Sequence, residues 1–412
     1  MDVTAVRALA SVEGQTLLRS LPPHDEAAAL ALTARLRALG HDPALVAAAL
    51  TQQRLRARAR AKFGEFADGM IFTAEGLEQA TRLEVATTHA HRFGAASLAT
   101  VHDLGCGIGA DAMTMSVLGV TVRAVDADPV TAAVADVNLR PWPDSRARVG
   151  RAEDFRPPPD AQRDRVGAWL DPARRLPGRA DARGRARRVF RLHEMSPPWQ
   201  VVLDVAAAVP ATGAKLSPSL PHEAVPVGCE AQWTSWDGDV VECAVWWGPL
   251  VRTAGRTARV LGPGRLPVEV TAASVDPDVP AATSLADVGA WLYETDRAVV
   301  RAGLVGAVTA ATDGTELEAG LGHVVAGRAV DLAFARRYAV TEAMPFTVKS
   351  LRAWLRERGV TGATIKKRGV RLDDDSLRRD LRLGRGSGEG NQVTLLLTRL
   401  AGDTVVLVLE AG

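Results

Sequence analysis

The chain has 412 residues, more than one ordinary domain holds, so two or three domains are expected. Its 47% hydrophobic and 24% charged residues are typical of a globular protein, and the lack of any run near ~18 apolar residues excludes a membrane-spanning class. Three cysteines argue against a disulfide framework. The N-terminus has no basic head followed by an apolar core, so we expect no signal peptide and a cytoplasmic location.

The formal net charge of +2 is unevenly distributed. From Phe334 to Gly412 there are 15 Lys and Arg against 9 Asp and Glu, a balance of +6, which leaves −4 for the rest. A basic C-terminal part predicts a polyanionic partner. A solvated basic face explains the balance equally well at this point.

Residues 1–95 have the pattern of a helical domain. Apolar residues recur three and four positions apart through "EAAALALTARLRALG", and Gly40 and Pro43 end that run. A second helix is predicted for "PALVAAALTQQRLRARARAKFGEF".

Residues 96–250 alternate short apolar strands with helices, which predicts an α/β domain with a doubly wound, Rossmann-like parallel sheet. Near its end, "CEAQWTSWDGDVVECAVWW" predicts an antiparallel hairpin that turns at Asp237-Gly238. Residues 251–332 carry no recognisable chemistry and are expected to form a connecting region. Residues 333–412 read as a small α/β domain.

Gly105, Gly107 and Gly109 lie in the predicted turn between the first strand and its helix. Glycine there permits positive φ and lets a ligand approach the backbone N–H groups. A nicotinamide dinucleotide enzyme uses a similar turn and an acid about 20 residues later, which Asp126 would supply. The glycines therefore do not decide between cofactors.

Acids at three successive strand ends favour S-adenosylmethionine. Asp103 precedes the turn, where a carboxylate would repel a pyrophosphate but attract the ammonium of the methyl donor. Asp126 is placed to accept both ribose hydroxyls, and Asp154 to accept the adenine amine. The alternative is that these acids cap the following helices.

The pattern "DLGCGIGAD…AVDADP" resembles class I S-adenosylmethionine-dependent methyltransferases over about 96–250. The resemblance implies a seven-stranded sheet ending in the hairpin. It also extends the donor site to further residues around the three acids: Cys106, Ala127, Asp128 and Glu153.

Residues 69–93, "GMIFTAEGLEQATRLEVATTHAHRF", called the upstream segment below, resemble the trimethylguanosine-synthase-like RNA methyltransferases and their bacterial relatives with a C-terminal THUMP-like domain. The resemblance implies that Glu78, Thr81 and Arg82 close the donor pocket. A polar helix face is the alternative for these three.

The same relatives carry a Lys-Phe pair, here Lys62-Phe63, and a Lys-Lys-Arg-Gly strand, here from Lys366 to Gly369. With these features the resemblance covers nearly the whole chain. It implies an RNA-binding C-terminal domain over 333–412, with Lys62, Lys366, Lys367 and Arg368 as RNA contacts.

The fourth strand ends in "AWLDPARR", where amino-directed nucleic-acid methyltransferases have Asp/Asn/Ser-Pro-Pro-aromatic. Asp171 and Pro172 keep the acceptor and the rigid turn, but Ala173 and Arg174 replace the second proline and the ring. A base would therefore stack on a ring from elsewhere in the chain or on Arg174 itself. Eight arginines between 174 and 191, Arg175 among them, predict a phosphate clamp or a solvated loop. A later "SPPW", ending at Trp199, is interpreted as packing.

These observations predict a methyltransferase that modifies a base amine in tRNA or rRNA. A small-molecule or protein methyltransferase and a non-catalytic RNA-binding protein are the alternatives. No metal site is expected, since His89 and His91 would point to different sides of a helix.

Overall fold

The computed structural model describes residues 1–157, 159, 164–173, 175–180, 186–188, 192–274, 279–383 and 391–411. The chain divides into two compact units. Unit 1 comprises residues 1–220, 226–230 and 244–252, and unit 2 comprises residues 221–225, 231–243 and 253–412. Within the described ranges, no helix combines the length and the hydropathy needed to cross a membrane.

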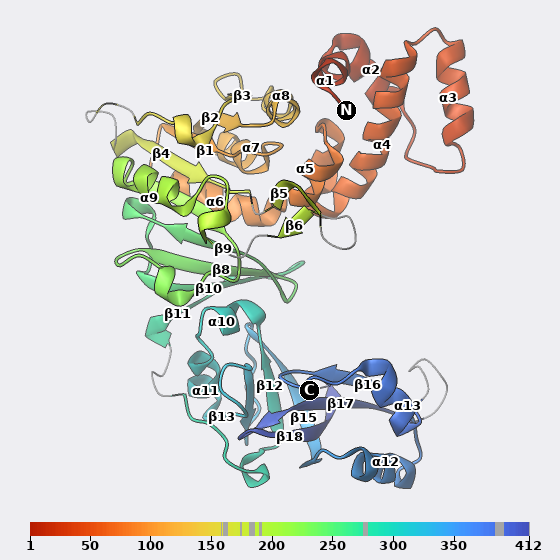
Figure 1. Ribbon diagram of the computed structural model, residues 1–412, viewed down its shortest axis with the longest axis vertical. Helices are drawn as coiled ribbons and strands as arrows, with labels where there is room; N and C mark the ends of the chain where they lie inside the picture. The colour runs from red at the N-terminus through yellow and green to blue at the C-terminus, as the bar shows by residue number, and fades with distance from the viewer. Residues whose placement is uncertain are drawn as a thin grey trace. The chain divides into compact units, whose positions relative to one another are not determined.

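Helices fill the N-terminal part of unit 1, as predicted (Figure 1). They are α1 (Val3–Ala10), α2 (Val12–Ser20), α3 (Ala29–Ala38), α4 (Pro43–Phe63), the 3₁₀ turn η1 (Gly64–Gly69), α5 (Ala74–Gln79) and α6 (Leu83–Ala95). The helix α4 begins where its sequence directs, because the Asp42 carboxylate accepts the N–H of Leu45 at 2.8 Å and Pro43 occupies the first turn.

Buried amides fasten the upstream segment to its neighbours. The side chain of Gln52 on α4 donates to the carbonyl of Phe72 at 2.8 Å and accepts its N–H at 2.9 Å. Asn138 bonds both backbone groups of Ile71 and donates to the carbonyl of Ile108 at 2.9 Å. Since Ile108 belongs to the glycine turn, these bonds place the upstream segment directly against that turn.

A nine-stranded sheet runs in the order β11-β10-β8-β9-β7-β4-β1-β2-β3. Its strands are β1 (Thr100–Leu104), β2 (Thr121–Asp126), β3 (Arg146–Val149), β4 (Val166–Leu170), β7 (Ala211–Leu216), β8 (Glu230–Trp236), β9 (Asp239–Trp246), β10 (Gly255–Leu261) and β11 (Val268–Thr271). The pairs β3–β2, β2–β1, β1–β4 and β4–β7 are parallel. The predicted sheet is thus present, and β10 and β11 extend it beyond the seven strands expected.

Helices cover both faces of the parallel part, as a doubly wound sheet requires. They are α7 (Ala110–Val117), α8 (Pro129–Asn138) and α9 (Trp199–Ala208). Met115 of α7 and Leu139 after α8 share one core cluster with Phe93 of α6 and Trp169 of β4. On the other face, residues of α9 pack with Leu104 and Leu170 of the neighbouring strands.

The hairpin turns at Asp237 and Gly238, whose φ angles of 50° and 83° are the positive values that a two-residue turn of this kind needs. The cysteines near it, Cys229 and Cys243, are unpaired, as expected. The remaining short elements in the described ranges are η2 (Ala152–Asp154), β5 (Arg175–Ala180), β6 (Ala186–Arg188), η4 (Leu192–Glu194), η5 (His222–Ala224), η6 (Gly248–Leu250), η7 (Ala272–Ser274) and η8 (Leu285–Asp287).

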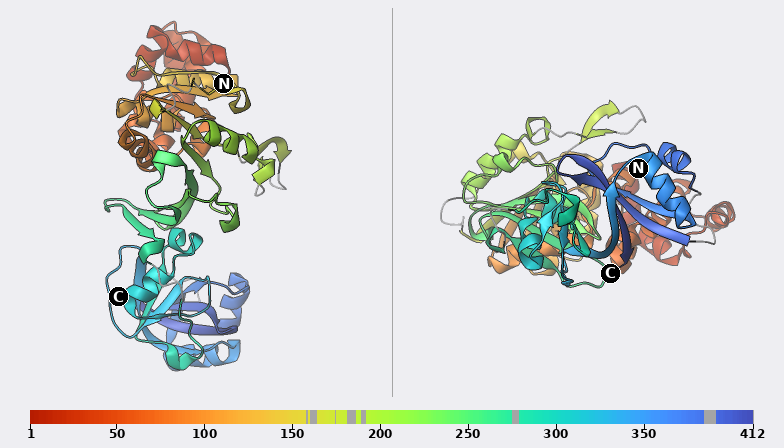
Figure 2. Two further views of the ribbon diagram at one scale, coloured as in Figure 1. Left: turned by 90° about the vertical axis from the view of Figure 1, so that its left-hand side faces the viewer. Right: turned by 90° about the horizontal axis from the view of Figure 1, so that it is seen from below.

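Unit 2 contains a seven-stranded sheet in the order β13-β14-β12-β15-β18-β17-β16. Its elements are β12 (Trp291–Thr295), α10 (Arg297–Arg301), α11 (Gly306–Thr312), β13 (Thr315–Glu316), β14 (His323–Ala326), β15 (Ala335–Pro345), α12 (Val348–Glu357), β16 (Val360–Lys367), α13 (Asp374–Leu381), β17 (Asn391–Leu400) and β18 (Asp403–Ala411). Leu351 of α12 and Leu377 of α13 pack with Leu395 of β17 and Val406 of β18, so both helices lie on one face (Figure 2).

The range 251–332, expected as a connecting region, contributes strands to both sheets. The strands β10 and β11 extend the larger sheet, whereas β12, β13 and β14 belong to the same sheet as the tail. In particular, β12 pairs with β15 from Trp291 opposite Ala339 to Thr295 opposite Ala335. The tail therefore does not close its own sheet, and it packs as one body with residues from about 279 onward.

Candidate active site

The turn after β1 is built from three glycines with positive φ: 103° at Gly105, 56° at Gly107 and 88° at Gly109. A Cβ at Gly105 would lie 3.0 Å from the carbonyl oxygen of Asp171, so space as well as backbone conformation requires glycine there. A Cβ at Gly107 would meet nothing within 4 Å. The turn thus brings the ends of β1 and β4 together and leaves open space beside Gly107.

Asp103, at the end of β1, is a buried acid without a partner. Its side chain is 1% exposed, and within the described residues neither carboxylate oxygen has a hydrogen-bond partner. Burial raises the pKa of Asp103 well above its ordinary value, and repulsion from Asp111 and Asp171 adds to the rise. A carboxyl group in this position matches a ligand that carries positive charge to it.

Asp126, at the end of β2, braces the glycine turn. Its carboxylate accepts the N–H of Gly107 at 3.0 Å and the N–H of Asp128 at 2.9 Å, while burial raises its pKa. Asp128 accepts the N–H of Thr131 at 2.7 Å and so caps α8, which matches the capping role considered for strand-end acids. Ala127, between them, is exposed.

The other predicted donor contacts differ in exposure. Glu153 and Asp154 lie in η2 after β3, where Glu153 pairs with Arg151 at 3.2 Å and Asp154 is exposed. Cys106 is buried inside the turn, and burial raises the pKa of its thiol well above the ordinary value. A thiol kept neutral in this way packs inside the turn and is not a nucleophile, and the donor contact that the resemblance implies for Cys106 stays a prediction.

A buried polar chain that sequence reasoning missed starts at Asp171. The carboxylate of Asp171, just past β4, forms an ion pair with Lys215 of β7. Lys215 Nζ donates to Thr81 Oγ1 at 2.8 Å, and that hydroxyl donates to Asp111 Oδ2 at 2.9 Å. The other oxygen of Asp111 lies 2.7 Å from Nδ1 of His89.

The signals for these missed residues are faint. Lys215 is a lone lysine in the apolar strand "GAKLS", and Asp111 is an acid in the first turn of the helix after the glycines. Of the three residues expected to close the donor pocket, Thr81 belongs to this chain of contacts. Arg82 donates to the carbonyl of Ala61 at 2.5 Å, which holds the end of α4. Glu78 contributes its carbonyl to Lys62 at 2.8 Å.

The turn after Asp171 lies next to the "SPPW" stretch. Pro172 is buried, and Ala173 and Ser196 exchange backbone hydrogen bonds of 2.7 and 3.3 Å. Trp199 lies 6.0 Å from Trp247 between ring centroids, in the packing role expected for it. Arg174 lies outside the described residues, and Arg175 is described only as backbone in β5.

Lys62 takes a role different from the RNA contact that the resemblance implies. Its ammonium donates to the carbonyls of Leu77, Glu78 and Ala80 at 2.8, 2.8 and 2.9 Å. Burial lowers its pKa to about 8, and repulsion from Lys215 and Arg82 contributes. All three of its protons hold the end of α5, and the contact with RNA that the resemblance implies stays a prediction.

The Lys-Lys-Arg strand is likewise used inside unit 2. Lys366 Nζ bonds Glu294 at 2.5 Å and the Tyr338 hydroxyl at 2.7 Å, and Lys367 pairs with Asp374. Arg368 is half-buried, and burial lowers its pKa. The two lysines therefore stabilise the fold of the tail, and the RNA contacts that the resemblance implies for them stay a prediction.

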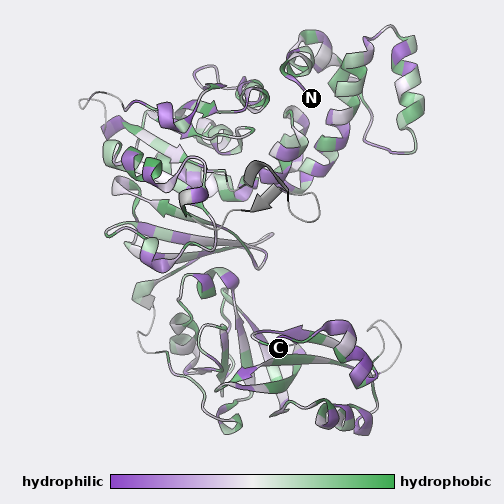
Figure 3. Cartoon of the chain, viewed as in Figure 1, coloured by the Kyte–Doolittle hydropathy of each residue, from purple (hydrophilic) through white to green (hydrophobic). Residues whose placement is uncertain are grey.

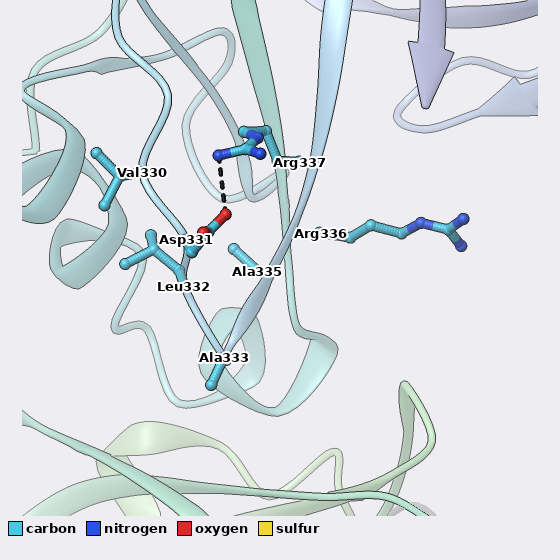
Figure 4. A pocket seen from close by; sticks show the side chains of 7 residues that line it. All are labelled: Val330, Asp331, Leu332, Ala333, Ala335, Arg336 and Arg337. Atoms are coloured by element: carbon cyan, nitrogen blue, oxygen red, sulfur yellow. Dashed lines mark ion pairs between the residues drawn. The ribbon is translucent and has the colours of Figure 1, made fainter. Parts of the chain in front are cut away.

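A separate hollow of about 480 Å³ lies in unit 2 and contains none of the predicted site residues. It is lined by residues of one stretch between Val330 and Arg337, in which Asp331 and Arg337 form an ion pair of 2.9 Å (Figure 4). Figure 4 shows Arg336 pointing away from this pair. In the described part of the chain, no group of three His, Cys, Asp or Glu residues is placed to hold a metal ion.

Comparison with known proteins decides the family. Over 360 residues the chain is 31% identical to an uncharacterised S-adenosylmethionine-dependent methyltransferase, found with the same figures in two strains of Mycobacterium tuberculosis. The alignment covers 85% of this chain and 92% of the relative. The chain belongs to the S-adenosylmethionine-dependent methyltransferases. The methyl donor is therefore its cofactor, as the strand-end acids indicate.

Two further matches describe the ends of this methyltransferase. The THUMP domain-like family matches residues 335–411, and a domain family of unknown function matches residues 2–59. The crystal structure of a provisionally assigned methyltransferase from Porphyromonas gingivalis W83 has the same fold, with a TM-score of 0.68 at 19% identity. The structural alignment covers 95% of this chain and the whole length of the Porphyromonas gingivalis chain.

Proposed function

We propose that this methyltransferase transfers the methyl group of S-adenosylmethionine to a base amine in structured RNA, such as tRNA or rRNA. The observation that carries the proposal is the position of Asp171. Its backbone carbonyl lies against the glycine turn, and its side chain, 28% exposed, follows the strand β4 next to that turn. A carboxylate and a carbonyl at this point provide the acceptors that an incoming amine needs.

The donor site fits the methyl donor, whose bound form supplies a methyl group on a positively charged sulfur. Asp103 offers a buried carboxylate without a partner, which suits the ammonium of the donor. Asp126 holds the glycine turn and retains acceptor capacity for ribose hydroxyls, since each carboxylate oxygen accepts more than one hydrogen bond.

In the transfer itself, the Asp171 carboxylate accepts a hydrogen bond from the amine and so directs the nitrogen lone pair toward the methyl group. The nitrogen–carbon bond forms as the carbon–sulfur bond breaks, with the bonding electrons remaining on sulfur. The proton that the methylated nitrogen then sheds leaves through Asp171 to water. Pro172 restricts the backbone beside the carboxylate, which keeps these acceptors in place.

The RNA part of the proposal is supported by the THUMP domain-like match and by the exposed side of α12. Lys349, Arg352 and Arg356 are exposed and are spaced three and four residues apart, so they share one helix face. Leu351 and Leu355 are buried on the opposite face, and the outer side of α12 is strongly hydrophilic (Figure 3). We assign phosphate contacts to this basic stripe, since the two lysines of the Lys-Lys-Arg strand already have partners inside unit 2.

Mass spectrometry of nucleosides tests the proposal. RNA from a strain lacking the gene is compared with RNA from the parent and from strains complemented with the wild type or Asp171→Asn. We expect one methylated nucleoside to disappear on deletion and to return only with the wild type. Identical nucleosides in all four strains would contradict an RNA substrate and favour a small-molecule or protein acceptor.

A further inference from the structure

Lys215 holds the one carboxylate on which the proposed amine chemistry depends. It follows Ala214, which pairs with Leu170 in the parallel ladder between β7 and β4. Lys215 therefore lies beside Asp171 at the carboxyl ends of the two strands. Its side chain is only 6% exposed, while that of Asp171 is 28% exposed, so the carboxylate is the more accessible partner of the pair.

The ammonium of Lys215 is held from more than one direction. In addition to the ion pair with Asp171, it donates to Thr81, whose hydroxyl is fixed by Asp111. Asp111 is held in turn by His89, whose ring lies 4.5 Å from that of Trp169 between centroids. Trp169 is two residues before Asp171 on β4, so the chain of contacts returns to the strand from which it started.

The charges around Lys215 explain why a lysine is retained in such a buried place. Asp103, Asp111 and Asp171 gather within a short distance, and the positive charge of Lys215 lowers the pKa values of Asp103 and Asp111 that their burial raises. Without Lys215, Asp171 would lose this neighbouring positive charge while the acids remain, and it would take up a proton more readily. A protonated Asp171 would be a weaker acceptor for an amine.

We propose that Lys215 is a positioning residue for methyl transfer, which keeps the Asp171 carboxylate ionised and oriented toward the incoming nucleophile. This inference rests on the proposed function, because it gives Asp171 the role of amine acceptor. It adds to the proposed active site a residue from β7, which lies outside the Asp171-Pro172 turn. It also gives Thr81 the task of supporting Lys215, in place of the direct donor contact that the resemblance implies.

Carbon NMR of ¹³C-carboxyl-labelled aspartates tests the inference without any substrate. The signal of Asp171 is assigned by its loss in Asp171→Asn, and its protonation midpoint is followed in the wild type, Lys215→Met and Lys215→Arg. We expect Lys215→Met to move the midpoint upward by about 1–3 pH units, the range for removing a neighbouring opposite charge, and Lys215→Arg to restore most of that shift. The control is Lys62→Met, which removes a nearby cation that does not contact Asp171.

Single-turnover transfer from labelled donor to bulk RNA of the deletion strain supplies the second measurement. Lys215→Met is expected to bind the donor within about threefold of the wild type but to lose tenfold or more in rate. That loss should shrink as the pH rises, and Lys215→Arg should recover much of the rate at neutral pH. If Lys215→Met does not fold, Lys215→Gln, which removes the charge but keeps a polar side chain, takes its place in both measurements.

The two measurements separate the two ideas. An unmoved Asp171 midpoint in Lys215→Met overturns the role of Lys215, whatever the rate. A rate loss that is the same at every pH overturns it as well, because a merely structural defect would look this way. If the wild type binds the donor but methylates no RNA, the proposed function fails, and the NMR result still decides whether Lys215 controls Asp171.

Discussion

The carboxylate of Asp126 accepts the backbone N–H of Gly107 at 3.0 Å, and this bond ties the end of β2 to the middle of the glycine turn. One side chain thereby shapes the backbone of the turn, and we propose that the donor rests on this turn and that Asp126 also binds it. Since Gly107 has positive φ and open space beside it, the bond orders the part of the turn that a ligand could approach.

Asp126→Ala should therefore weaken S-adenosylmethionine binding by roughly 1–3 kcal/mol, the scale for removing a buried acceptor from its donors. Isothermal titration with the donor and its demethylated product measures the effect, starting from micromolar affinity in the wild type and with NAD as a ligand that should not bind. Asp42→Ala, which removes the cap of α4 far from the turn in sequence, is the control. Unchanged affinity in Asp126→Ala would remove Asp126 from the donor site.

Asp103→Asn should stabilise the ligand-free chain while weakening donor binding. Burial raises the pKa of Asp103, so the folded chain keeps a proton that the unfolded chain loses as the pH rises above about 4. Stability contributed at this site is thus highest at low pH and falls as the pH rises toward the folded-state pKa. The variant should melt higher than the wild type at pH 7, by about 2–4 °C per kcal/mol, with the difference fading toward pH 4.

The same proton links donor binding to pH. An ammonium next to Asp103 favours the ionised carboxylate, so binding should release a proton and should tighten as the pH rises. Titration in buffers of different ionisation enthalpy detects the release in the wild type and its absence in Asp103→Asn. If Asp103→Asn were less stable than the wild type at neutral pH and kept its donor affinity, Asp103 would have a structural partner and no role in donor binding.

Breaking the buried ion pair between Arg92 and Glu230 should lower the free energy of unfolding far more than breaking a surface ion pair. The two carboxylate oxygens of Glu230 lie 2.5 and 3.2 Å from the guanidinium, both side chains are 2% exposed, and Arg92 also donates to the Leu250 carbonyl at 2.9 Å. Glu230→Gln leaves a buried charge without its partner, so urea unfolding should show a loss of about 3–5 kcal/mol. The surface pair of Arg60 and Asp68, both more than half exposed, provides the control: Asp68→Asn should cost under about 1 kcal/mol. Equal effects of the two variants would contradict this assignment.

The basic stripe on α12 should govern RNA affinity. Reversing Lys349, Arg352 and Arg356 to Glu should weaken binding of bulk tRNA and reduce the slope of log affinity against log salt by about 2–3, because about three phosphate contacts are lost. Donor binding should stay the same. Lys366→Met is the contrasting variant, since Lys366 bonds Glu294 and Tyr338 inside unit 2. If Lys366→Met loses RNA binding and the α12 variant does not, the stripe is not the RNA contact.

The parts of the site that the sequence predicts are those whose causes are local. Positive φ at Gly105, Gly107 and Gly109, the helix caps and the Asp237-Gly238 turn follow from a few neighbouring residues, and the structure has them. The resemblance to known methyltransferases extends these predictions to the seven-stranded sheet and to the THUMP-like C-terminal domain. The position of Asp171 at the edge of the sheet can be predicted because this residue directly follows a parallel strand.

What the sequence could not predict depends on partners far away in the chain. Lys215 meets Thr81 across 134 positions, and Arg92 meets Glu230 across 138. Lys366 looked like an exposed base on a short strand, but the sheet brings it to Glu294, which is 72 positions away. In each case the charge is visible in the sequence, while the residue that neutralises it is placed by the fold.

Transfer of labelled methyl groups in a purified system is the direct test of whether this protein methylates a base amine in RNA with the help of Asp171. The wild type and Asp171→Asn are incubated with methyl-labelled S-adenosylmethionine and bulk RNA from the deletion strain, and the labelled nucleoside is identified by mass spectrometry. We expect one N-methylated base with the wild type and at least about 10²-fold slower labelling with Asp171→Asn at equal donor affinity. Label on carbon, on ribose or on no RNA at all, or full activity in Asp171→Asn, would contradict it.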